Sequence, residues 1–285
     1  MSVVVTGATG HLGPLVLEAL LQRGVPAGEI VAVGRKLEKI KDFADRGVRT
    51  AYVDYSDPES LRSAFEGAQK VLLISGSEVG QRIPQHANVI DAAKAAGVER
   101  IVYTSILGIE TTTMNLADEH KATEALLRES GIPFTLLRHG WYLENYLTHL
   151  TTAVPTGTIY GSAGEGRISA ATRADFAEGA AVALIDDSHA GAVYELGGDE
   201  AFTMPELAAE ITALTGTEVS YQDLPTADYE QALLGAGLPA PVAAMLADND
   251  RAISQGELET HSGDLSRLIG RPTTKLTEAL KAAKE

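Results

Sequence analysis

The amino-acid sequence predicts an α/β fold in which a doubly wound parallel sheet carries a smaller α/β cap at its C-terminal end. Over the first 150 residues, short runs rich in β-branched residues alternate with segments whose apolar residues recur every three or four positions. A glycine triplet also stands between the first run and the first helical segment. Such alternation is typical of parallel strands joined by helices that cover both faces of the sheet.

The expected elements follow one another in a regular order. The strands are VVVTG (3–7), IVAVGR (30–35), TAYVDY (50–55), KVLLIS (70–75), RIVYTS (100–105) and FTLLR (134–138). Between them lie helical segments such as GPLVLEALLQRG and QHANVIDAAKAAG, which end on Gly24 and Gly97 as capped helices do. We therefore expect a first domain over residues 1–150.

The rhythm changes after about residue 150. Isolated strand-like runs (TIYG, AVYELGG and EVSYQDL) lie among helices, and prolines at 155, 205, 225, 239 and 272 punctuate them. This pattern predicts a smaller cap over residues 151–285, parts of which can return to the main sheet.

Composition excludes several classes of protein. The chain of 285 residues has no cysteine, which rules out disulfides, thiolate metal sites and a cysteine nucleophile, and favours a reducing compartment such as the cytoplasm. The apolar start MSVVV is too short for a secretory signal, and no apolar run reaches the roughly 18 residues of a membrane span. The net charge of −16 opposes binding to nucleic acid.

The stretch TGATGHLG carries the first functional motif, with glycines at 7, 10 and 13 between strand and helix. Gly7 allows a tight turn, Gly10 lets backbone amides approach a pyrophosphate, and Gly13 lets the helix lie close to the sheet. A turn that merely connects two elements would also use glycine. The placement between strand, helix and second strand predicts a dinucleotide-binding Rossmann domain.

The end of the second strand is basic, although the protein is acidic. Gly34, Arg35 and Lys36 stand where a carboxylate would bind the ribose hydroxyls of NAD. A guanidinium pairs instead with a 2′-phosphate through charge-assisted hydrogen bonds. The sequence therefore predicts a preference for NADPH, unless Arg35 is only a solvated surface charge.

Several further motifs occur in a recognisable order: VDYSDPESL, LLISGSEVGQR, QHANVIDAAKAAGVERIVYTS, LADEH, TLLRHGWYLENY, AGEGRISAATRADFAEGAA, VYELGGDEAFT and SRLIGRPTT. Together with the glycine loop, they resemble the NmrA-like atypical short-chain dehydrogenases nearly end to end. The pattern is most similar to the type 2 NAD(P)H:quinone oxidoreductases, and the triphenylmethane dye reductases form a sister group.

The resemblance implies a set of binding positions. The glycine loop would hold the pyrophosphate, Arg35 the 2′-phosphate, and the stretch from His139 the nicotinamide, with Asp54 near the adenine and Asn145 near the substrate mouth. The residues so assigned to NADP(H) are Gly7, Ala8, Thr9, Gly10, His11, Leu12, Arg35, Ser75, Gly76, Ser77, His139, Gly140, Trp141 and Tyr142.

The chain departs from the dehydrogenases that reduce carbonyls. Those enzymes place a tyrosine four residues before a lysine, and the lysine and cofactor ribose lower the phenol pKa so that it exchanges a proton with the substrate. Here Lys121 is present, but Ala117 stands at the position of the tyrosine. Ser105 and Lys121 therefore look like two members of a serine, tyrosine and lysine set whose tyrosine is missing. The catalytic candidates are Tyr142, Asn145 and Lys121.

An electron-poor quinone accepts hydride readily, and its oxygens can take protons from water. The sequence thus predicts an enzyme that transfers hydride from NADPH directly to a small quinone-like acceptor, without flavin, as a monomer or homodimer. Reduction of triphenylmethane dyes, imines or activated alkenes, and a non-catalytic NADP-binding redox sensor, remain alternatives. The histidines show no metal-binding spacing, so no metal is expected, and Asp118, Glu119 and His120 suggest a solvated or network-forming helix face.

Overall fold

The computed structural model describes residues 2–78 and 80–284. Seven strands form one sheet, in the order β3-β2-β1-β4-β5-β6-β8, and every neighbouring pair is parallel. The strands are β1 (Val3–Val5), β2 (Ile30–Gly34), β3 (Arg49–Tyr52), β4 (Lys70–Leu73), β5 (Arg100–Ile106), β6 (Phe134–His139) and β8 (Val193–Leu196). This confirms the predicted doubly wound parallel sheet.

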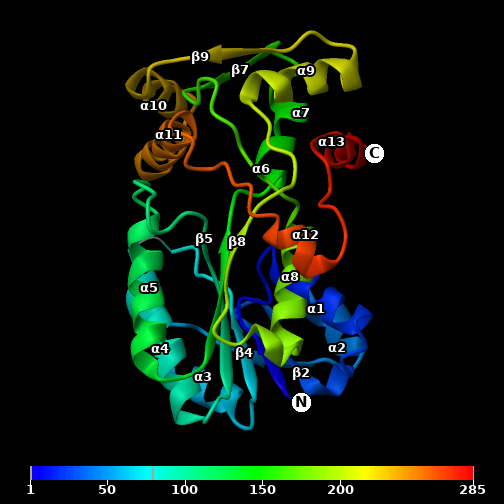
Figure 1. Ribbon diagram of the computed structural model, residues 1–285, viewed down its shortest axis with the longest axis vertical. Helices are drawn as coiled ribbons and strands as arrows, with labels where there is room; N and C mark the ends of the chain where they lie inside the picture. Colours follow the sequence, from blue (N-terminus) through cyan, green and yellow to red (C-terminus); the bar gives the residue numbers. More distant parts are fainter. Residues whose placement is uncertain (1, 79, 285) are drawn as a thin grey trace.

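Helices cover both faces of the sheet (Figure 1). On one face, α3 (Pro58–Phe65), α4 (Arg82–Ala95) and α5 (Ala117–Ser130) pack on strand residues such as Val4 and Tyr103. On the other, α1 (Gly13–Gln22), α8 (Arg173–Ile185) and α12 (Asp264–Ile269) pack on residues such as Val5 and Leu72. Short helices η1 (Ala27–Glu29), η2 (Leu37–Ile40), α2 (Lys41–Asp45) and η3 (Asp187–His189) connect the layers.

The cap lies at one end of the sheet (Figure 1) and has its own apolar core. Its strands β7 (Thr158–Gly161) and β9 (Ser220–Asp223) form a two-stranded parallel sheet. The helices of this part are α6 (Glu144–Leu147), α7 (His149–Thr152), α9 (Met204–Thr215), α10 (Thr226–Gly235), α11 (Ala240–Ser254) and α13 (Leu276–Lys284). Although β8 and α8 follow residue 150, they complete the main sheet and its helical layer.

The parallel sheet brings distant segments of the chain to one edge. Because all strands run in the same direction, the loops that follow β1, β2, β4 and β6 leave the sheet at the same side, which is where doubly wound folds bind their ligands. Within the described residues, no helix combines the length and apolar character needed to span a membrane.

Candidate functional site

The glycine loop between β1 and α1 has the shape that its sequence predicts. Gly7 adopts a φ of +62°. The backbone amide of the next residue, Ala8, donates a hydrogen bond to the Val33 carbonyl of β2 at 2.9 Å. A Cβ added at Gly13 would lie 2.4 Å from the Cα of Ala8. Only glycine therefore lets the start of α1 lie so close to the loop.

The same loop presents unpaired donors. No hydrogen bond joins the backbone amides of Thr9, His11 and Leu12 to any other described residue. The N-cap residue Leu12 has no side chain that could cap α1, and Gly10 and His11 are exposed. Free amides at a helix N-terminus favour an anion such as a pyrophosphate.

Arg35 lies directly beyond β2 and is half exposed. Its Nη1 pairs with Glu78 Oε1 at 2.5 Å, and Glu78 also accepts a hydrogen bond from Gln85 of α4 at 2.9 Å. The hydrogen bond and charge of Glu78 raise the pKa of Arg35, and the Gln85 and Arg35 bonds lower the pKa of Glu78. The guanidinium thus remains charged beside an exposed carboxylate that an incoming phosphate could replace.

Two side chains hold the loop that follows β4 in place. The Ser75 amide donates to Thr104 Oγ1 at 2.9 Å, and the Gly76 amide donates to His86 Nε2 at 3.0 Å. His86 is buried, and desolvation lowers its pKa to about 3, so the ring stays neutral and can accept that bond. Ser75 and Gly76 are therefore held in a defined position at the edge of the sheet, and Ser77 follows them into the exposed part of the loop.

The segment after β6 forms a compact aromatic group. The His139 ring stacks on Phe176 of α8 with centroids 4.4 Å apart, and its Nδ1 lies 3.4 Å from the Tyr142 hydroxyl. Gly140 donates to the Leu196 carbonyl at 2.7 Å. Burial lowers the pKa of His139 to about 3 and raises the pKa of Tyr142 to about 12, so both rings are neutral near pH 7. The buried Nε2 of His139 has no partner within the described part of the chain.

A cavity of about 570 Å³ opens beside this segment, toward the cap. Trp141 and Asn145 line it, and Arg173 of α8 donates to Asn145 Oδ1 at 3.1 Å while its guanidinium lies 4.6 Å from the centre of the Tyr142 ring. The structure thus brings Trp141, Tyr142 and Asn145 together next to a space of the size that a small aromatic ligand needs.

The remaining candidates have other surroundings. Lys121 is exposed on α5, and its Nζ lies 3.5 Å from the Thr112 carbonyl. Ser105 donates to the buried carboxylate of Glu124 at 2.6 Å, and Ala117 packs in the core of the cap. Asp54 accepts from the Ser56 amide at 2.8 Å and shapes the turn after β3. Ser105 is therefore committed to a structural hydrogen bond.

An ionic network centred on Arg138 of β6 was not predicted from the sequence. Arg138 of β6 pairs with Glu124 at 2.8 Å, with Glu195 at 2.8 Å and with Glu110 at 2.7 Å. Burial acts to raise the pKa of Glu124, but the hydrogen bonds from Arg138 and Ser105 and the charge of Arg138 hold that pKa below its usual range. The signal was an arginine inside an otherwise apolar strand, FTLLRH, where a charge must be paired.

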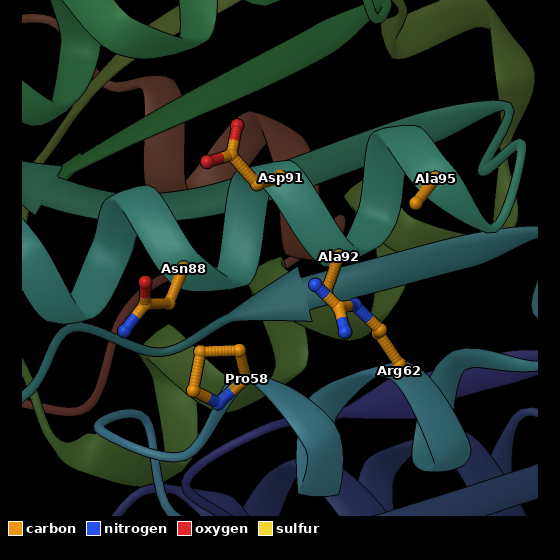
Figure 2. A pocket seen from close by; sticks show the side chains of 6 residues that line it. All are labelled: Pro58, Arg62, Asn88, Asp91, Ala92 and Ala95. Atoms are coloured by element: carbon orange, nitrogen blue, oxygen red, sulfur yellow. The ribbon is translucent and has the colours of Figure 1, made fainter.

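A second, smaller cavity of about 180 Å³ lies between α3 and α4 (Figure 2). Two of its polar side chains have partners, since Asn88 donates to the Tyr55 carbonyl at 2.9 Å and Arg62 donates to Glu59 at 3.2 Å. It contains none of the predicted site residues. In the described ranges, no group of three or more histidine, aspartate or glutamate side chains could hold a metal ion.

Comparisons with known proteins agree with this geometry. The model of the NmrA-like family matches residues 1–283. Quinone oxidoreductase 2 of Escherichia coli (strain K12) is 51% identical over 278 residues, which cover 98% of this chain and 97% of that protein. The crystal structure of the Escherichia coli NADPH-dependent quinone oxidoreductase QOR2 complexed with NADPH superposes with a TM-score of 0.97 at 50% identity, covering 99% of this chain and 100% of that one. The triphenylmethane reductase of Citrobacter sp., complexed with NADP(H), gives a TM-score of 0.94 at 39% identity over 99% of this chain and 100% of that one.

Proposed function

The chain belongs to the NmrA-like family, and from this premise we propose that it is an NADPH-dependent quinone oxidoreductase. The predictions of family, enzyme class and NADP(H) made from the motifs are confirmed by the comparisons. The structural observation that carries the proposal is a pair of anion sites at one sheet edge, formed by the free amides of the glycine loop and by Arg35.

The residues present fit NADPH. The unpaired amides of Thr9, His11 and Leu12 would hold the pyrophosphate, and Arg35 would hold the 2′-phosphate after releasing Glu78. The buried Nε2 of His139, which has no partner among the described residues, would offer a polar atom to the nicotinamide. When bound, NADPH supplies the hydride.

The protein's own contribution is binding and orientation. The bonds from Ser75 and Gly76 to Thr104 and His86 fix the loop that would lie along the cofactor. Tyr142 is held between His139, Phe176 and Arg173, so its ring can form one wall beside the reacting carbon. Its raised pKa makes it a hydrogen-bond donor rather than a base near pH 7.

The acceptor would enter from the cap. The cavity beside Trp141 and Asn145 is large enough for a quinone and has polar side chains in its lining. The roles of Tyr142, Asn145 and Lys121 remain predictions. So do the cytoplasmic location and the monomeric or homodimeric state.

Two measurements test the proposal. Purified protein without added flavin should oxidise NADPH when 1,4-benzoquinone is present, and a redox sensor would bind NADPH without this turnover.

Trp141 is the only tryptophan of the chain, and it lines the cavity, so NADPH should quench its fluorescence in a saturable way. In Gly10→Val the added side chain would stand in the exposed bend of the loop and should abolish the quench. Binding detected by calorimetry without any change in emission would remove Trp141 from the nicotinamide site.

A further inference from the structure

Helix α5, which lies beside α4 (Figure 1), contributes a carboxylate to the loop between β4 and α4. The structure describes this loop at residues 74–78 and 80–81. Glu119 Oε1 accepts hydrogen bonds from the backbone amides of Gly80, at 2.9 Å, and of Arg82, at 3.3 Å. Its Oε2 accepts a bond from Nη1 of Arg82 at 2.9 Å, and the two side chains are only 13% and 6% exposed. Desolvation offsets much of the attraction in a buried ion pair, so stability alone does not account for these contacts.

Two chains of hydrogen bonds connect Gly76 to Glu119. In the first, the Gly76 carbonyl accepts a bond from Nε of Arg82 at 2.9 Å, and Arg82 pairs with the Glu119 carboxylate. In the second, the Gly76 amide donates to Nε2 of His86 at 3.0 Å, and Nδ1 of His86 lies 2.9 Å from Thr123 Oγ1. The Thr123 hydroxyl donates to the Glu119 carbonyl at 2.9 Å. Both chains therefore end on the same residue of α5.

The second chain is satisfied at every atom. Since Nε2 of His86 accepts a hydrogen bond, the proton of this neutral ring is on Nδ1, which donates it to Thr123 Oγ1. Both side chains are completely buried, so water does not compete for these bonds. A buried polar network without unpaired groups fixes the position of the groups that it joins.

Glu78, the partner of Arg35, lies between Gly76 and Gly80 in the chain. Glu119 thus holds the main chain on both sides of the residue that pairs with Arg35. A segment that is ordered before a ligand arrives loses less conformational entropy on binding, which increases the affinity.

We propose that Glu119 is a positioning residue for NADPH, which fixes the main chain of Gly76 from two sides in the arrangement that the cofactor binds. The inference rests on the proposed function, because it requires NADPH to lie along this loop. Position 117 of α5 carries alanine where the dehydrogenases that reduce carbonyls carry tyrosine. In this chain, α5 acts on the cofactor loop through Glu119 and does not supply a phenol to the substrate.

Glu119→Gln tests the first chain. The new side chain keeps an oxygen for the Gly80 amide but presents an uncharged group to Arg82. The Kd for NADPH, measured by calorimetry without quinone, and the KM for NADPH should both rise about tenfold. The kcat at saturating NADPH and the KM for 1,4-benzoquinone should stay within about twofold of wild type. Glu178→Gln is the control, because it removes a carboxylate of α8 that pairs with two arginines on the other face of the sheet, and it should change none of these values.

A pair of substitutions separates positioning from stability. Glu119→Leu leaves a buried guanidinium unpaired and should lower the unfolding free energy. Adding Arg82→Leu should recover most of this loss, because two apolar side chains then replace the buried ion pair. The Kd for NADPH should nevertheless stay at least about fivefold above wild type, since no side chain then holds the Gly76 carbonyl. Recovery of both stability and NADPH affinity would show that Glu119 acts through stability alone, and would overturn the inference.

Thr123→Val tests the second chain in the nucleotide-free protein. It removes the hydroxyl from a buried side chain of nearly the same shape and leaves Nδ1 of His86 without its partner. Hydrogen exchange at the Gly76 amide should become about tenfold faster in Thr123→Val and in Glu119→Gln, and should not change in Glu178→Gln. Wild-type exchange and NADPH affinity in Thr123→Val and Glu119→Gln would overturn the inference. If Glu119→Gln does not fold, Thr123→Val and the double leucine variant decide. Wild type that binds NADPH but does not reduce benzoquinone would refute the proposed function alone.

Discussion

At the scale of single residues, we propose that the pair formed by Arg35 and Glu78 sets the choice between NADPH and NADH. Both side chains are about half exposed, so their ion pair contributes little to stability and can be exchanged. A 2′-phosphate carries more charge than a carboxylate and can accept two parallel bonds from the guanidinium. Arg35 should therefore favour NADPH, and Glu78 should compete with it.

Arg35→Ala tests the first half of this argument. The substitution should weaken the binding of NADPH by about 1.5 to 3 kcal/mol, because a charge-assisted hydrogen bond is lost, and should barely change the affinity for NADH. Isothermal calorimetry with both cofactors measures the difference. Equal losses for NADPH and NADH would show that Arg35 does not contact the 2′-phosphate.

Glu78→Gln tests the second half. Removing the competing carboxylate should raise the affinity for NADPH several-fold, or by up to about 1 kcal/mol for an exposed pair, and should have little effect on the affinity for NADH. Glu59→Gln is the matched control, because Glu59 also pairs with an exposed arginine, Arg62, at 3.2 Å, but lies in α3. Unchanged NADPH affinity in Glu78→Gln would show that breaking the ion pair between Arg35 and Glu78 does not reduce the free energy of NADPH binding.

At the scale of elements, the close approach of α1 to the glycine loop shapes the proposed pyrophosphate site. A Cβ at position 13 would overlap the Ala8 backbone, so α1 or the loop must move. Gly13→Ala should cost about 1 to 3 kcal/mol of unfolding free energy and weaken NADPH binding.

Gly28→Ala is the control for this substitution, since nothing lies within 4 Å of a Cβ added there. Its unfolding free energy should stay within about 0.5 kcal/mol of wild type. Urea unfolding and NADPH titration of both variants measure the contrast. A Gly13→Ala protein as stable as Gly28→Ala, with normal NADPH affinity, would show that the loop tolerates the displacement.

The elements also show how far the sequence could lead. The six early strands and the helices ending near Gly24 and Gly97 were predicted because parallel buried strands read as apolar runs and helix ends need glycine. The glycine loop and Arg35 could be predicted as cofactor-binding positions because such positions have a fixed spacing in the sequence. Glu78, the partner of Arg35, and the residues of the cap that line the cavity beside Trp141 could not be predicted, because they come from separate elements that only the tertiary fold brings together.

At the scale of the whole molecule, buried neutral histidines couple stability to pH. Desolvation lowers the pKa of His86 and of His139 to about 3, and the pKa of His120 well below its usual value. In the unfolded chain these rings titrate near 6.5, so below that pH the unfolded state binds more protons and the folded state loses stability.

The unfolding free energy should therefore be constant above about pH 7 and decrease as the pH falls through 6.5, by up to about 1.4 kcal/mol per pH unit for each histidine. Asp250 acts in the opposite sense between about pH 4 and 6, because its raised pKa lets the folded state bind the extra proton. Urea titrations at about pH 7.5, 6.5 and 5.5 measure the slope. Equal stability at all three would contradict the neutral, buried state of these rings.

The central claim for the whole molecule is that hydride passes directly from NADPH to the acceptor without a proton-donating side chain. Lys121 is exposed, and Ala117 replaces the phenol that it would activate. The most direct measurement is kcat/KM for NADPH oxidation by 1,4-benzoquinone in wild type and in Lys121→Met, with cyclohexanone as a second acceptor. The account predicts a loss of at most about tenfold with benzoquinone, against the 10² to 10⁴ typical of a lost general acid, and no turnover of cyclohexanone by either protein. Collapse of the quinone activity in Lys121→Met, or efficient reduction of cyclohexanone by wild type, would contradict it.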